Sequence, residues 1–180
     1  QNTLTLEKAI NLYEDQKFHA AEKEFTQYID QNPDAPDALL AMTKTLLAQQ
    51  KYPEALMILN HFPASRQSDI ASQLIRFIKL MQQYQSNDLP NRSALEATFL
   101  TTLRLVQIKN YEAALDGLLD ILKVDKSFRN GDAKTIFLAI LEILPDSSID
   151  KRKYRMELSS VLFYPQPYFP HFFIMMLLIK

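Results

Sequence analysis

The histidines are the first residues to test for chemistry, because an imidazole can hold a metal ion or carry a proton near neutral pH. His19, His61 and His171 are far apart in the sequence and lack the short spacing of metal ligands. The sequence has no cysteine, which removes thiolate ligands and a thiol nucleophile. It also shows no glycine-rich phosphate loop and no Ser-His-Asp order. We therefore expect no enzyme, no metal site and no cofactor.

Basic side chains form the clearest charged cluster: Lys151, Arg152, Lys153 and Arg155. They fall at the start of an expected helix, where cations oppose the helix macrodipole. The cluster is interpreted either as a solvated face or as a docking patch for an acidic partner. The net charge of −1 gives no electrostatic reason to expect nucleic acid or an anionic membrane as a partner. The longest apolar run, residues 172–179, is too short for a membrane-spanning helix of about 20 residues.

A repeated pattern determines where these side chains are placed. Residues 17–22 read KFHAAE, residues 51–56 read KYPEAL, and residues 110–115 read NYEAAL. Ala21 and Ala55 lie 34 residues apart, as do Phe18 and Tyr52. This period is the length of a tetratricopeptide unit, a helix–turn–helix whose apolar face is buried only when units stack.

Small and aromatic residues in the pattern have separate roles. Two helices of a unit cross where only a small side chain fits, which accounts for Ala21, Ala55 and Ala114, because larger residues would be overpacked. The aromatic residues before them, Phe18, Tyr52 and Tyr111, are expected to fill the turn between the helices. On these residues the chain resembles the tetratricopeptide family. Two positions that are usually glycine in that family differ here: Ala9, Thr43 and Thr102 occupy the first, and Gln16, Gln50 and Lys109 occupy the turn.

Composition favours an all-α fold, since 47% of the residues are apolar and only two are glycine. The sequence predicts a tetratricopeptide-like helical-hairpin solenoid of about nine helices over residues 1–164. We assign repeats to about 2–35, 36–63 and 92–126, an inserted spacer helix to 68–85, a closing helix pair to 131–164, and a hydrophobic tail to 165–180.

The first helices of these units are expected to line an inner, partner-binding face. The residues assigned to this face are Leu6, Ile10, Tyr13, Leu40, Lys44, Leu47, Phe99, Leu103 and Val106. Lys44 is the only cation among them, so a clamp for a partner's terminal carboxylate is not expected. An apolar groove for a hydrophobic helix or an extended segment fits better. The alternative, that the spacer helix or the tail fills this face, is left equally open.

A narrower resemblance covers nearly the whole chain. Its most specific residues lie near the end: Gly131-Asp132, 134–137 (KTIF), Ile140-Leu141, 153–155 (KYR), Leu158 and 162–164 (LFY). With the order of repeats, they resemble the C-terminal region of bacterial thioredoxin-fused tetratricopeptide proteins, the chaperedoxins. The resemblance implies unfolded clients and chaperonin as partners in the cytoplasm, with redox chemistry left to the thioredoxin domain. Because the sequence opens with Gln1 and not Met, we expect a fragment or a processed chain.

The sequence therefore predicts a protein–protein interaction module that captures apolar peptide segments, in a co-chaperone setting, with the basic helix as a second contact. The alternative is a scaffold or assembly subunit for one folded partner. The apolar tail at 165–180 needs cover, so we expect it to pack on its own body or on a second copy in a homodimer.

Overall fold

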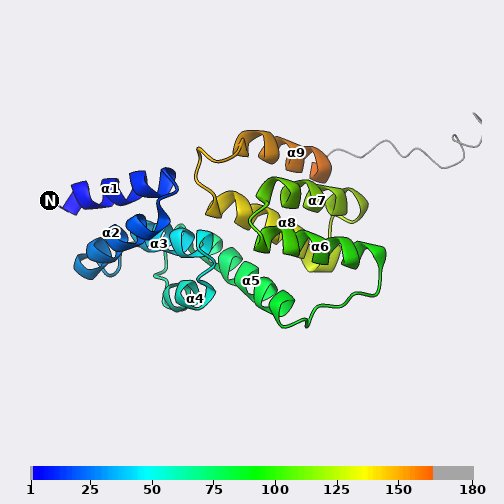
Figure 1. The fold of residues 1–180 in the computed structure, drawn as a ribbon, viewed down its shortest axis with the longest axis horizontal. Coiled ribbons are helices and arrows are strands. Elements are labelled where there is room, and N and C mark those ends of the chain that lie inside the picture. The colour runs from blue at the N-terminus through cyan, green and yellow to red at the C-terminus, as the bar shows by residue number, and fades with distance from the viewer. Residues whose placement is uncertain (1, 164–180) are drawn as a thin grey trace, which may run out of the picture.

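A computed structural model describes residues 2–163, with side chains from Thr5 onward. Within this range it contains nine helices and no strand (Figure 1). They are α1 (Asn2–Glu14), α2 (Phe18–Gln31), α3 (Pro36–Ala48), α4 (Tyr52–Asn60), α5 (Ser68–Gln85), α6 (Ala94–Gln107), α7 (Tyr111–Val124), α8 (Phe128–Ile143) and α9 (Lys151–Phe163). The predicted all-α class is confirmed. The tail at 165–180, with its expected packing or dimer contact, lies outside the described residues.

Three helix pairs carry the repeated pattern: α1–α2, α3–α4 and α6–α7. Ala21, Ala55 and Ala114 are fully buried, as expected for residues at helix crossings. The third pair has a further close approach, because a Cβ added to Gly117 would stand 2.8 Å from the Oγ1 of Thr102. Thr102 occupies a position that is usually glycine, and Gly117 on the facing helix provides the room.

The turn within each pair contains a residue in the left-handed region. Gln16, Gln50 and Lys109 have φ angles of 59°, 61° and 62°. A residue with a side chain is strained there, by about 1 kcal/mol or more relative to glycine. In the tetratricopeptide pattern these three positions are usually glycine. The positive φ angles explain why, because glycine adopts them without strain.

The helix α8 begins with a sharp turn over residues 129–131. Arg129, Asn130 and Gly131 all have positive φ, so the regular helix starts at Asp132. Arg76 of α5 holds this turn by donating to the carbonyl oxygen of Asn130 at 2.8 Å and to the Asp132 carboxylate at 2.7 Å.

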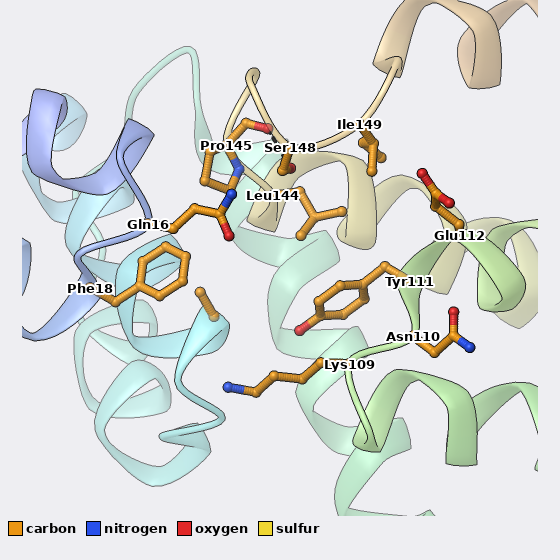
Figure 2. Close-up of a pocket in the computed structure, with 11 residues that line it drawn as sticks. Gln16, Phe18, Lys109, Asn110, Tyr111, Glu112, Leu144, Pro145, Ser148 and Ile149 are labelled. Atoms are coloured by element: carbon orange, nitrogen blue, oxygen red, sulfur yellow. Dashed lines mark hydrogen bonds between the residues drawn. The ribbon is translucent and has the colours of Figure 1, made fainter.

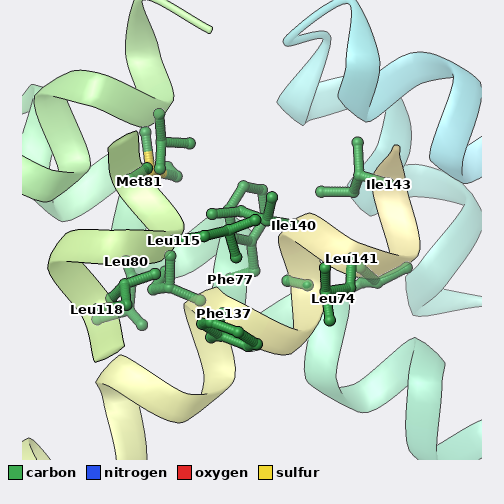
Figure 3. Close-up of a cluster of buried hydrophobic side chains, with 14 of the residues drawn as sticks. Leu74, Phe77, Leu80, Met81, Leu115, Leu118, Phe137, Ile140, Leu141 and Ile143 are labelled. Atoms are coloured by element: carbon green, nitrogen blue, oxygen red, sulfur yellow. The ribbon is translucent and has the colours of Figure 1, made fainter. Parts of the chain in front are cut away.

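The centre of the molecule is α8, which packs against α3, α5 and α7. Consecutive residues of α8 are buried, including Phe137 and Ile140, which meet Phe77 of α5 and Leu115 of α7 in the main core (Figure 3). A helix whose apolar residues face several directions must be covered on each of those sides. The residues assigned to a spacer helix form α5, which is one wall of this core.

A second, smaller core lies between α1 and α2 and consists of Ala9, Tyr13, Ala21 and Phe25. Phe18 packs against both cores. No helix within residues 2–163 is long and apolar enough to cross a membrane.

Candidate partner-binding pocket

The apolar inner face predicted from the sequence is largely closed. Six of its nine residues are buried: Tyr13, Leu40, Leu47, Phe99, Leu103 and Val106. Leu6 and Lys44 are half-buried, and Ile10 is 42% exposed. These six side chains are not accessible to a partner in this structure, so partner binding at this face stays a prediction.

The face is closed by the end of α8 and the loop that follows it. The Tyr13 hydroxyl donates to the carbonyl oxygen of Ile143 at 2.5 Å, and the Lys44 ammonium contacts Glu142 at 2.8 Å. The Ser147 hydroxyl donates to the carbonyl oxygen of Glu14 at 2.9 Å. The spacer helix or the tail was expected to fill this face if no partner did. The element that closes it in the described chain is α8.

The face of α6 is closed separately. Phe99 meets Phe128 of α8 with ring centroids 5.3 Å apart, in an edge-to-face arrangement. The Arg129 guanidinium lies 5.9 Å from the centroid of the Phe99 ring. Aromatic and cation–π contacts of this kind add to the stabilisation from burial. Phe99, Leu103 and Val106 are therefore core residues.

The basic cluster lies on α9 and forms ion pairs within the chain. Lys151 contacts Asp146 at 2.7 Å, and Arg155 lies 3.8 Å from Glu142. The hydrogen bond from Lys151 holds the pKa of Asp146 below its ordinary value. Lys153 lies 3.8 Å from Glu157 on the same helix, whereas Arg152 is exposed and forms no ion pair with the described residues. Most of the charge of the cluster is thus already compensated, in part by α8 and its loop.

A pocket of about 390 Å³ remains open where two intra-repeat turns face each other (Figure 2). We call it the turn pocket. It is lined by Gln16, Phe18, Ala48, Lys109, Asn110, Tyr111, Glu112, Leu144, Pro145, Ser148 and Ile149. Gln16 and Phe18 belong to the α1–α2 turn, and Lys109 and Tyr111 hold the same positions in the α6–α7 turn. The α8–α9 loop closes one side.

A specific contact fixes the position of the α6–α7 turn relative to the first two helix pairs. The Gln50 side chain, in the turn between α3 and α4, donates to the carbonyl oxygen of Gln107 at 2.8 Å. That carbonyl lies at the end of α6, where the last helical carbonyls lack partners within the helix. The contact places Lys109 beside the turns of the first two pairs.

The turn pocket combines apolar walls with unused polar groups. The rings of Phe18 and Tyr111 are half-buried, and Leu144 is buried behind them. The Tyr111 hydroxyl points towards the side where Phe18 and Lys109 lie (Figure 2). Burial raises the pKa of Tyr111 to about 12, so the phenol stays protonated and can donate a hydrogen bond. Within residues 2–163, neither this hydroxyl nor the Lys109 ammonium has a hydrogen-bond or ion-pair partner.

From the sequence, Phe18 and Tyr111 were expected only to fill the turns, and the pocket between them was missed. One signal was available, namely that Gln16 and Lys109 replace the usual turn glycine. A residue other than glycine that is held in a strained backbone conformation often marks a functional site. The facing of the two turns was not visible, because it depends on contacts between residues far apart in sequence. The described residues contain no group of His, Asp and Glu able to hold a metal ion.

Comparison with known proteins agrees with the repeat pattern. Two family models, both described as tetratricopeptide repeat, match residues 12–76 and 80–163. An uncharacterized protein of Haemophilus influenzae is 31% identical over 136 residues, which cover 71% of this chain. The chain spans 62% of the length of that relative. A solved domain of protein VP0806, of unknown function, from Vibrio parahaemolyticus is 24% identical, with a TM-score of 0.40 over 88% of this chain and 98% of that one. Since the two models together match most of the described residues, the chain belongs to the tetratricopeptide repeat family.

Proposed function

We propose that this chain is an interaction module that binds a short segment of one specific partner protein in the turn pocket. Tetratricopeptide repeats generally mediate protein–protein interactions, which sets the class of activity. The observation that carries the proposal is the pairing of Phe18 and Tyr111 across a pocket with an unpartnered hydroxyl and an unpaired ammonium. Apolar walls with a few directed polar groups are typical of binding sites.

The size of the pocket supports a peptide anchor as the ligand. A volume of about 390 Å³ is at the lower end of the range for ligand sites, roughly 300–1,000 Å³. It accommodates one or two side chains of an extended segment. Interfaces typically depend on a few residues in such pockets, with the surrounding contacts excluding water.

Capture of many unfolded clients, as in the co-chaperone interpretation, requires a broad exposed apolar surface. The large exposed apolar residues of the described chain are Ile10, Met57, Ile108, Val124, Met156 and Phe163. They belong to five different helices or their ends and do not form the predicted groove. We therefore favour the scaffold alternative, with a single partner, over unfolded clients and chaperonin. A cytoplasmic setting stays a prediction.

The test begins with a random dodecapeptide library displayed on phage and selected against the full chain. Selected peptides are synthesised with a fluorophore and titrated by fluorescence anisotropy. Ser148→Phe should fill the pocket and weaken binding at least about tenfold, which corresponds to about 1.4 kcal/mol. Met57→Ser, on the exposed side of α4, should leave binding unchanged. Thermal melting of each variant confirms that it is folded.

A parallel assay measures how well the chain suppresses aggregation of two unrelated unfolded proteins. A single-partner module should give no suppression at equimolar ratio. Suppression of both clients, together with peptides whose affinity ignores Ser148→Phe, would show that the turn pocket is not the binding site.

A further inference from the structure

We infer that the bound segment is acidic on one side of its apolar anchor and crosses the turns of the first two helix pairs from the turn pocket. This inference rests on the proposed function, and it adds the chemistry and the direction of the ligand. It depends on a path of connected pockets and on the distribution of charge along that path.

The path consists of two further hollows next to the turn pocket. The first, of about 470 Å³, shares Gln16, Phe18 and Lys109 with the turn pocket and adds Lys17, His19 and Lys51. The second, of about 360 Å³, shares His19 and Lys51 with the first and adds Glu22, Lys23, Thr26 and Gln27 of α2. Because adjacent hollows share lining residues, an extended chain can pass from one to the next. We call this path the turn groove.

Cations dominate the turn groove beyond the turn pocket. Lys109 and Lys23 form no ion pair with the described residues. Lys17 contacts Asp15 at 3.0 Å, but both side chains are 62% exposed, and exposed pairs of this kind are weak. Lys51 contacts Glu22 at 2.7 Å, so this pair adds little net charge. The groove therefore presents a surplus of positive charge to a ligand.

The opposite end of the turn pocket carries the other sign. Glu112 lines that end, on the side of Ile149 in Figure 2, and it forms no ion pair with the described residues. A segment anchored between Phe18 and Tyr111 thus meets Lys109 on one side and Glu112 on the other. Complementary charge chiefly sets specificity and orientation in such contacts. Acidic residues should follow the anchor towards Lys109, and not towards Glu112.

The experiment uses three fluorescent dodecapeptides with one central leucine. One has three glutamates on a single side of the leucine, the second has lysines in their place, and the third has the glutamates but serine for the leucine. The first should bind the full chain at least about tenfold more tightly than the other two, with affinity falling as salt rises. Lys109→Glu should weaken the first peptide about five- to tenfold and strengthen the lysine peptide, as for an exposed attraction turned into repulsion.

Direction is tested with a second pair of peptides, in which the glutamates precede or follow the leucine. One order should bind more tightly, and Glu112→Lys should reduce the difference between the two. The matched control is Lys126→Glu, an exposed reversal outside the turn groove, which should change neither affinity.

Each outcome distinguishes this inference from the proposed function. If library peptides bind and respond to Ser148→Phe but lack acidic residues, the turn pocket is right and the charge inference is wrong. If the glutamate and lysine peptides bind equally, the inference is likewise overturned. If a single-stranded oligodeoxythymidylate binds more tightly than the glutamate peptide and is equally sensitive to Lys109→Glu, the groove recognises phosphate and not an acidic peptide.

Discussion

The closure of the inner face by α8 can be tested at a single hydroxyl group. Tyr13 is 8% exposed, and its hydroxyl donates to the Ile143 carbonyl at 2.5 Å. Tyr13→Phe removes the donor, keeps the ring, and leaves a carbonyl at the end of α8 without this partner. Leaving a buried acceptor unpaired costs about 1–3 kcal/mol. At about 2 kcal/mol, a chain of this size should melt about 4–8 °C lower.

The assay is urea and thermal unfolding followed by the helical circular dichroism signal, with the full chain throughout. Tyr28→Phe in α2 is the matched control, because Tyr28 is half-buried and its hydroxyl has no hydrogen bond with any described residue. That substitution should stay within about 0.5 kcal/mol of the parent. Equal unfolding midpoints for the two variants would refute the closure of the face through Tyr13.

The difference in stability between Tyr13→Phe and the parent should also depend on pH. Burial, followed by the nearby Glu14 carboxylate, raises the pKa of Tyr13 well above its ordinary value of 10.0. The folded phenol therefore stays protonated after the unfolded one has begun to ionise. Stability from this group is fully present below pH 10 and falls as the pH rises further. The difference between Tyr13→Phe and the parent should shrink above that value.

Three further predictions concern packing and charge. Ala21→Leu or Ala55→Leu should destabilise the chain by about 1–3 kcal/mol in urea unfolding, because each position is packed at a helix crossing. Ala20→Leu, at an exposed position, should have little effect, and equal effects of these substitutions would contradict the helix crossings. Gly117→Ala should be destabilising because its Cβ meets Thr102, and adding Thr102→Ala should restore most of the loss; no recovery in the double variant would count against this contact. Burial raises the pKa of Glu22, but hydrogen bonds from Lys51 and Gln49 outweigh burial and hold the pKa below 4.5. The parent should therefore lose stability relative to Glu22→Gln as the pH falls through and below that value, and parallel pH profiles would disprove the pairing.

Local features of the fold could be predicted from the sequence because their causes are local. A small residue at each crossing identified the helix pairs at Ala21, Ala55 and Ala114. Asp150 immediately precedes the last helix, and its carboxylate accepts from the Lys153 amide at 2.9 Å, as an N-cap residue does. Such signals depend on neighbours within one or two helical turns, so they can be read without knowing the rest of the fold.

The candidate site could not be predicted in the same way. Tyr13 on α1, and Leu40 and Leu47 on α3, belong to apolar helix faces that the spacing of the residues reveals. Spacing does not say whether such a face meets a partner or another part of the chain. The missing information was the position of α8. Its run of Ile136, Phe137 and Ile140 among further apolar residues was a usable signal, since a helix that is apolar on most sides belongs in the centre of a fold.

The contacts between α1 and the end of α8 also have a consequence for how the molecule unfolds. A linear array of repeats can lose its terminal unit while the rest stays intact, since each unit touches only its neighbours. Here the small core of α1 and α2 is tied to residues more than a hundred positions later, through Tyr13 and Glu14. The N-terminal pair is thus prevented from fraying independently, and amide hydrogens in α2 and α8 should exchange with solvent in one shared opening event.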